Sequence, residues 1–169
     1  MTGEWVLLSY RLPREPSSPR VALWRRLKRY GIAQISDGLV ALPADARTRE
    51  QLEWAAEEVI EHDGTASVWL AHPASAAQER ELATTMTDAR AKEYLDVESA
   101  ALHALEEPPA ARRKALTALR RTYREVHRRD FFPPAERERA HTALRRLEEL
   151  AAADTAPAPV TRATTQGLR

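Results

Sequence analysis

The sequence of 169 residues predicts an α+β protein in which a four-stranded sheet with two helices precedes three further helices. Three observations carry this prediction. Four short runs rich in β-formers lie before Pro73, and two runs with helical periodicity separate them in the order βαββαβ. After Pro73 the apolar residues recur only at helical spacing. The length suits one domain with a helical extension better than two full domains.

The strands are defined by β-formers and by turn residues. We expect them over residues 4–12, 32–36, 39–42 and 66–71. The first carries apolar side chains on both faces at its start, which is typical of a central strand. Asp37 and Gly38 are the strongest short-range signal for a tight hairpin, and they join the second and third strands.

The first helix has clear start and stop signals. Ser18 is expected as its N-cap, Pro19 suits the first helical position, and Gly31 ends it. Helical spacing directs four apolar side chains toward the sheet, namely Val21, Leu23, Trp24 and Leu27. The cationic residues of this helix are spread over the remaining arc.

The later helices follow from capping and periodicity. Thr48 and Gln51 predict a capping box at the start of the second helix, and Gly64 closes that helix. Three more helices are expected over residues 75–105, 110–129 and 135–152. Phe131 and Phe132 are expected to anchor the turn between the last two helices in the core.

This order of elements is the ferredoxin-like arrangement, in which two helices cover one face of an antiparallel sheet. We therefore divide the chain into a ferredoxin-like domain over 1–73, a helical segment over 74–152 that packs on it or extends from it, and a disordered tail over 153–169. The second face of the sheet must be solvated or covered by another part of the chain.

Charge is segregated along the chain although the net charge is only +1. Residues 1–43 carry 7 basic and 3 acidic side chains, residues 44–107 carry 5 and 15, and residues 108–152 carry 12 and 6. Such a chain can present a basic face to a polyanion. Equally, its acidic middle can pair with its basic ends.

Several classes of function have no support in the sequence. The absence of cysteine excludes disulfides and thiolate chemistry, and no nucleophile elbow, P-loop or metal-ligand spacing is present. His127 and Asp130 could share a hydrogen bond but lack a third ligand. We therefore expect no enzyme activity, no cofactor and no metal. With no apolar run near the roughly 20 residues of a membrane span, we expect a cytoplasmic protein without membrane contact.

Two basic clusters, on the first helix and within 110–129, are the candidate binding residues, because arginine forks bind phosphate oxygens bidentately. The expected nucleic-acid or oxyanion contacts are Arg20, Arg25, Arg26, Arg29, Arg113, Arg120, Arg121, Arg124 and Arg128. The alternative is a solvated helix face with local ion pairs, including pairing of the second cluster with the acidic second helix. No helix-turn-helix or other recognition motif predicts sequence-specific reading.

Several motifs combine in this chain. They are a W-x-L-L strand from Trp5, the pattern R-x-x-x-W-R-x-L-K from Arg20, the hairpin D-G-L-V-A-L-P from Asp37, and the ending REVHRRDFFPPAERERA from Arg124. Together they resemble the N-terminal domain of the ChrB family, bacterial chromate-resistance regulatory proteins. The resemblance covers about residues 4–150.

The resemblance implies a regulator of chromate-efflux operons whose N-terminal part contacts DNA. The chain ends soon after its last predicted helix, so we expect a free-standing N-terminal module that lacks the C-terminal chromate-response domain. Its expected partners are DNA, a separate protein of that C-terminal type, and a second copy of the chain. The alternative is a protein-interaction module that docks a sensor subunit, or itself, through the acidic segment or an uncovered sheet face.

A weaker similarity links the first strand, basic helix and hairpin to the central domain of PaaX-type repressors and to the small nuclease-related subunits of CRISPR adaptation. In the nuclease-related family, an Asp at the end of the first strand binds the metal. Arg11 stands at that place here. Because a cation does not ligate a divalent metal, nuclease activity is not expected.

Overall fold

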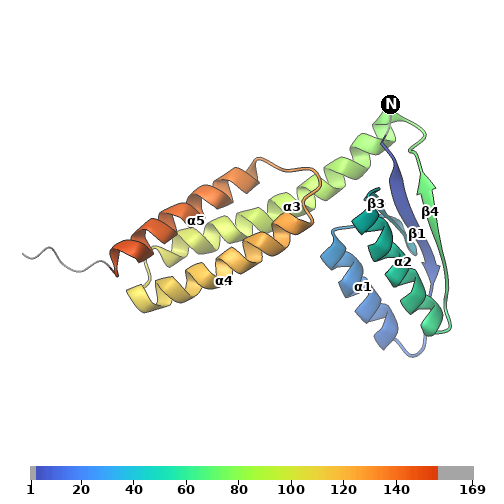
Figure 1. Ribbon diagram of the computed structural model, residues 1–169, viewed down its shortest axis with the longest axis horizontal. Coiled ribbons are helices and arrows are strands. Elements are labelled where there is room, and N and C mark those ends of the chain that lie inside the picture. Colours follow the sequence, from blue (N-terminus) through green and yellow to red (C-terminus); the bar gives the residue numbers. More distant parts are fainter. Residues whose placement is uncertain (1–2, 156–169) are drawn as a thin grey trace, which may run out of the picture.

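The computed structural model describes residues 3–155, and in this range a four-stranded antiparallel sheet is combined with five helices (Figure 1). The strands are β1 (Trp5–Arg11), β2 (Ala33–Ser36), β3 (Leu39–Pro43) and β4 (Thr65–Ala71). The helices are α1 (Ser18–Tyr30), α2 (Ala46–Glu61), α3 (Ala76–Ala104), α4 (Pro109–Arg128) and α5 (Glu136–Ala153). The predicted mixed α/β composition is confirmed.

The strand β1 lies in the middle of the sheet, as its two-sided apolar pattern predicted. The strand order is β2-β3-β1-β4, and Leu8 of β1 faces Val40 of β3 and Val68 of β4. The helices α1 and α2 cover one face of this sheet (Figure 1). Leu23 and Leu27 of α1 are buried in the core beneath them.

On the opposite face of the sheet, other parts of the described chain (residues 3–155) cover the end at Trp5. There the indole of Trp5 stacks on Phe132 with ring centroids 6.1 Å apart, and its Nε1 donates to Oε1 of Glu79 in α3 at 3.3 Å. Phe131 lies beneath the guanidinium of Arg47 and packs against the same core, so the predicted anchoring of this turn is confirmed. Trp69, on the same face but at the edge strand β4, remains 59% exposed.

The long helix α3 belongs to two hydrophobic cores. Met86, in its first half, is buried in the core beneath the sheet. Tyr94 and Val97, in its second half, are buried in a second core with α4 and α5, which pack along this part of α3 (Figure 1). Leu116 and Val126 are the buried residues of α4 in that second core.

A network of charged and polar side chains lies where the two cores adjoin. Arg90 is 7% exposed, and its Nε lies 2.8 Å from Oε2 of Glu93. The other oxygen of Glu93 accepts from Nη2 of Arg129 at 2.8 Å. The hydroxyl of Tyr94 donates to Oδ2 of Asp130 at 2.9 Å. The network ties α3 to the segment between α4 and α5.

The partner of Asp130 differs from the sequence-based expectation. We considered a hydrogen bond with His127, but Asp130 accepts from Tyr94 instead, and Nε2 of His127 lies 3.3 Å from Nη2 of Arg137. The reason is that α4 ends at Arg128, so Asp130 has left the helix and no longer shares a face with His127.

The N-cap residues of α1 and α2 differ from those predicted. The N-cap of α2 is Asp45, whose Oδ1 accepts from the backbone N–H of Thr48 at 2.7 Å while Oγ1 of Thr48 accepts from the N–H of Asp45 at 2.9 Å. The capping box is therefore formed by Asp45 and Thr48, not by Thr48 and Gln51. The helix α1 begins one residue earlier than predicted, with Ser17 at the N-cap position and no side-chain cap.

The predicted tail begins too early. Ala153 is the last residue of α5, and the carboxylate of Asp154 pairs with Arg112 of α4. The rest of the tail, residues 156–169, lies outside the described residues. Within residues 3–155, no helix combines the length and apolar character that crossing a membrane requires.

Candidate nucleic-acid and anion interface

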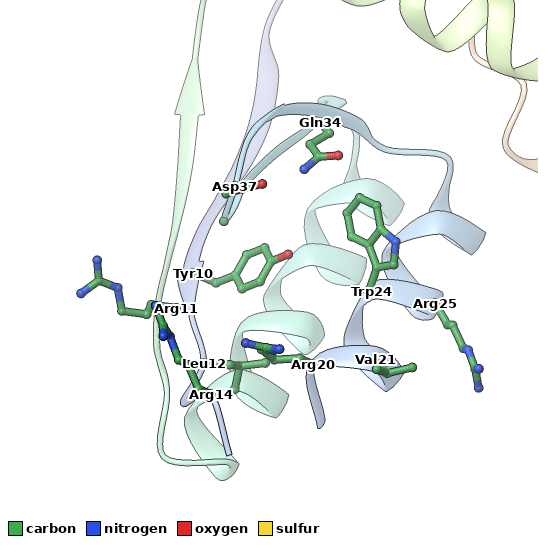
Figure 2. A pocket seen from close by; sticks show the side chains of 11 residues that line it. Tyr10, Arg11, Leu12, Arg14, Arg20, Val21, Trp24, Arg25, Gln34 and Asp37 are labelled. Atoms are coloured by element: carbon green, nitrogen blue, oxygen red, sulfur yellow. The ribbon is translucent and has the colours of Figure 1, made fainter. Parts of the chain in front are cut away.

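An open cavity of about 980 Å³ lies between the end of β1, the turn joining β2 to β3, and the first half of α1 (Figure 2). We call it the β1–α1 cavity. Its lining residues are Tyr10, Arg11, Leu12, Arg14, Arg20, Val21, Trp24, Arg25, Gln34, Asp37 and Gly38. Four arginines and one acidic residue, Asp37, therefore line this cavity.

The turn between β2 and β3 forms one wall of the cavity. Gly38 has a φ of +73°, and its carbonyl oxygen accepts from the N–H of Tyr10 at 2.8 Å. A Cβ at this position would lie 2.4 Å from the carbonyl oxygen of Tyr10, so only glycine fits here. This close approach fixes the turn and Asp37 beside the end of β1.

Two residues of α1 that were expected to face the sheet, Val21 and Trp24, line the cavity. Val21 is 46% exposed, so the prediction of its burial is wrong, whereas Trp24 is partly buried and packs against the core as predicted. The fully buried residues of α1 are Leu23 and Leu27. The ammonium of Lys28, one turn beyond Trp24, lies 4.7 Å from the centroid of its ring. The first half of α1 thus leaves an apolar and aromatic surface open to solvent.

The Tyr10 ring lies between β1 and α1 with its hydroxyl directed toward Trp24 (Figure 2). Burial, with a smaller contribution from Asp37, raises the pKa of Tyr10 above its usual value. The hydroxyl is therefore protonated at neutral pH and can donate a hydrogen bond. Gln34 and Asp37 lie beyond it at the hairpin end of the cavity (Figure 2).

The arginines lie at the other end. Figure 2 shows the guanidinium of Arg20 reaching from α1 toward β1, whereas Arg11 and Arg25 extend outward on opposite sides. Within residues 3–155, none of Arg11, Arg14, Arg20 and Arg25 forms an ion pair. These cations are available to an anion from solution.

The second half of α1 is partly neutralised. Nη1 of Arg26 lies 2.8 Å from Oε2 of Glu58, so the acidic helix α2 pairs with α1. Arg29 is exposed and makes no ion pair with the rest of the described chain. Of the four predicted contacts on α1, three therefore have no ion-pair partner among residues 3–155.

A second set of cations lies on the solvent face of α4. We call Arg113, Lys114, Arg121, Arg124 and Arg128 the α4 basic stripe. At 100° per residue these five positions fall within an arc of about 100°, opposite the buried face of the helix. All five side chains are exposed, and only Arg121 has a carboxylate partner in the described part of the chain, Glu125 at 3.0 Å. Arg120, beside the stripe, pairs with Glu148 of α5.

The acidic helix α2 does not neutralise α4, which answers one of the questions left open by the sequence. The helix α4 packs on α3 and α5, and the contact between α2 and α4 is a hydrogen bond from Nη1 of Arg47 to the carbonyl oxygen of Arg128 at 2.9 Å. At Gly31, the residue that follows α1, a Cβ would lie 2.9 Å from Cβ of Arg129. The two cationic helices thus meet end to end and not side by side (Figure 1).

Sequence reasoning missed part of the site. Tyr10, Arg11, Arg14, Gln34 and Asp37 line the β1–α1 cavity but were not among the predicted contacts. Arg11 and Arg14 lie close to Pro13, which ends the first predicted strand just before α1. Their charge and this position could have indicated that they belong to the same site as the cations of α1. Tyr10, Gln34 and Asp37 depend on the strand pairing, so local patterns did not indicate them.

The family model described as Protein ChrB, N-terminal matches residues 20–104, which is half of the chain. This chain belongs to the ChrB N-terminal family. The ChrB family is regulatory and linked to chromate resistance. The match includes α1 from Arg20 onward and most of the residues that line the β1–α1 cavity, but it excludes β1 and the α4 basic stripe. No curated protein matches this ChrB N-terminal chain significantly.

Proposed function

We propose that this member of the ChrB N-terminal family is a DNA-associated module of a transcriptional regulator and that it contacts the phosphate backbone through the α4 basic stripe. The observation that carries the proposal is the arrangement of that stripe: five exposed cations lie on one face of α4, and one of them has an acidic partner within the described part of the chain. Arginine side chains on phosphates release counterions, which supplies sequence-independent affinity. The proposed role is binding, without a catalytic step.

The geometry of α4 supports this role. Arg113 and Arg128 are 15 residues apart, which at 1.5 Å per residue places their backbones about 22 Å apart along the helix. A duplex presents a phosphate charge roughly every 1.7 Å of its axis, so several phosphates lie within reach of such a row. The opposite face of α4 is buried at Leu116 and Val126, which holds the stripe toward solvent.

The cations of α1 extend the surface. Because α1 and α4 meet at their C-terminal ends (Figure 1), Arg29 in the last turn of α1 stands near the end of α4 that carries Arg128. An extended row of cations can contact many phosphates of a DNA backbone at once, whereas a compact anion would contact few of these cations. Arg26 contributes less, since Glu58 already holds its guanidinium.

We also propose that residues 3–73 form a ferredoxin-like unit. The element order β1-α1-β2-β3-α2-β4 and the strand order β2-β3-β1-β4 support this assignment. On this view, the helical segment is an added binding arm, and a separate protein of the C-terminal ChrB type is the partner that would supply chromate response.

The salt dependence of DNA binding tests the proposal. Fluorescence anisotropy of a labelled duplex from the chain's own promoter region, titrated between 50 and 200 mM salt, should give a linear fall of log K with log salt. If each of the five stripe cations contacts one phosphate, the slope of log K against log salt should be about −4.5. No binding at low salt, or a slope near zero, would refute DNA association.

A second candidate function is protein interaction, which the exposed aromatic side chains favour. Trp69 on β4 is 59% exposed and Trp54 on α2 is 53% exposed. Aromatic side chains are enriched in protein interfaces. Sedimentation equilibrium of the chain tests self-association through Trp69. A mass that rises with concentration in the wild type but not in Trp69→Ser would support it, and a monomer at all concentrations would exclude it.

A further inference from the structure

We infer that the β1–α1 cavity is a binding site for a free nucleoside monophosphate, a ligand that combines a planar heteroaromatic ring with a phosphate. This inference goes beyond DNA association and does not depend on it, because the cavity lies at the opposite end of α1 from the α4 basic stripe. The cavity volume of about 980 Å³ falls within the range of small-molecule sites.

The cationic end of the cavity fits a phosphate. Arg14 and Arg20 line it and have no ion pair within the described chain, and Figure 2 shows the Arg20 guanidinium between α1 and β1. Each guanidinium offers two parallel N–H donors to the oxygens of a phosphate. A carboxylate would find the same donors, so this end alone does not define the ligand.

The middle of the cavity narrows the choice to an aromatic ligand. The rings of Tyr10 and Trp24 lie between the arginines and the hairpin turn (Figure 2). Both rings are only partly buried, and Val21 beside them is exposed although it is apolar. Stacking a planar base on these rings would remove apolar surface from water.

The hairpin end fits the polar edge of a base. Gln34 offers both a donor and an acceptor, the carboxylate of Asp37 accepts, and the Tyr10 hydroxyl donates. The exocyclic amino groups and ring nitrogens of nucleobases complement such a set. A bare tetrahedral oxyanion would use only the arginine end, and Asp37 would repel it.

Isothermal titration calorimetry of the full chain tests the inference without DNA. The probes are adenosine 5′-monophosphate, guanosine 5′-monophosphate, adenosine, inorganic phosphate and chromate. We expect one site per chain for at least one monophosphate, with adenosine and both oxyanions at least tenfold weaker. No monophosphate binding at millimolar concentration, or equal binding of phosphate or chromate, would overturn the inference.

Variants then locate the site. Arg20→Gln, on an exposed side chain, should weaken monophosphate binding about tenfold, and Trp24→Leu should weaken it by a similar factor. The matched controls are Arg29→Gln on the same helix and Trp54→Leu on α2, because neither residue lines the cavity. Their binding should equal that of the wild type. Equal weakening in a variant and its control would place the ligand elsewhere.

A competition arm separates the free nucleotide from a nucleotide within a DNA strand. The bound monophosphate is titrated with a single-stranded deoxythymidine 10-mer. We expect saturating monophosphate binding to persist, or to fall only at oligonucleotide concentrations above that of the monophosphate. Displacement at a tenfold lower concentration would show that the cavity serves a strand and would refute the free ligand. Loss of DNA binding in the salt titration leaves this result unaffected.

Discussion

The hydroxyl of Tyr94 in α3 donates a 2.9 Å hydrogen bond to Oδ2 of Asp130, a carboxylate that is fully buried between α4 and α5. The second oxygen, Oδ1, has no hydrogen-bond partner among the described residues. The nearest cation is Arg137, whose Nη1 lies 3.8 Å from Oδ2. Tyr94 is therefore the closest donor to a buried carboxylate at the junction of the two cores.

Removing that donor should destabilise the protein. Tyr94→Phe keeps the ring but leaves the Asp130 carboxylate without its shortest hydrogen bond, which should lower the free energy of unfolding by about 1–3 kcal/mol. Urea denaturation followed by circular dichroism measures the loss. Tyr123→Phe is the control, because the Tyr123 hydroxyl makes no hydrogen bond with the described residues. Equal losses in both variants would contradict the role of the hydrogen bond.

Stability should also fall in alkaline solution. Burial, followed by the hydrogen bond to Asp130, raises the pKa of Tyr94 above 10, so its contribution is complete below pH 10 and is lost as the pH rises toward the folded-state pKa. In this window the unfolded chain has released the proton that the folded chain keeps. In this window Tyr94 changes the free energy of unfolding by about −1.4 kcal/mol for each unit by which the pH rises.

Urea denaturation between pH 8 and pH 11 checks this dependence. Tyr94→Phe should reduce the steepness with which the free energy of unfolding falls above pH 10. The pKa values of Tyr10 and Tyr30 are also raised, mainly by burial, so a weaker slope is expected to remain in the variant. An identical slope in wild type and Tyr94→Phe would rule out the assignment.

The capping box of α2 should be measurable in the same assay. Asp45→Ala removes the acceptor for the N–H of Thr48 and should cost about 1 kcal/mol. Glu57→Ala, an exposed acidic residue within α2 that has no ion pair in the described chain, is the matched control and should change stability by less than about 0.5 kcal/mol. If Asp45→Ala behaves like Glu57→Ala, the cap does not stabilise the helix.

The α4 basic stripe makes a prediction about DNA binding. The triple variant Arg113→Gln, Arg124→Gln, Arg128→Gln removes three cations that have no ion-pair partner among residues 3–155. If each contacts a phosphate, the slope of log K against log salt should become less steep by about 2.7. Affinity at low salt should fall for all duplexes alike, since backbone contacts carry no sequence information.

The control for this variant carries the same charge change on other exposed surfaces. Arg80 of α3 together with Arg145 and Arg146 of α5 is changed to Gln in a second triple variant. Its salt dependence should stay close to that of the wild type. An equal decrease of the salt dependence in both triple variants would show that DNA binding depends on net charge alone and that α4 is not the contact surface.

Much of the fold could be predicted from short-range signals. The pair Asp37-Gly38 predicted the hairpin because a left-handed residue is needed there, and Gly38 has that conformation. The two-sided apolar pattern of β1 predicted its central position. The predicted start of α2 was wrong because a threonine can be either the N-cap of a helix or the N3 residue of a capping box. In the structure Thr48 is the N3 residue, and Asp45 is the N-cap.

The candidate site was predictable only in part. The cations on α1 and α4 were visible as charge runs, but their partners were not, since Glu58 and Glu148 are distant in the sequence from Arg26 and Arg120. Val21 was assigned to the core because helical spacing does not reveal where the neighbouring strands end. The β1–α1 cavity arises at that strand end.

The sharing of α3 between both cores has a consequence for the folding of the chain. Met86 and Tyr94 lie on one continuous helix, so melting either core would free part of the structure that the other core needs. We therefore expect a single cooperative transition, with hydrogen-exchange protection in the middle of α3 equal to that of global unfolding. A ligand that stabilises the sheet unit would then also protect the distant end of the helical bundle from exchange.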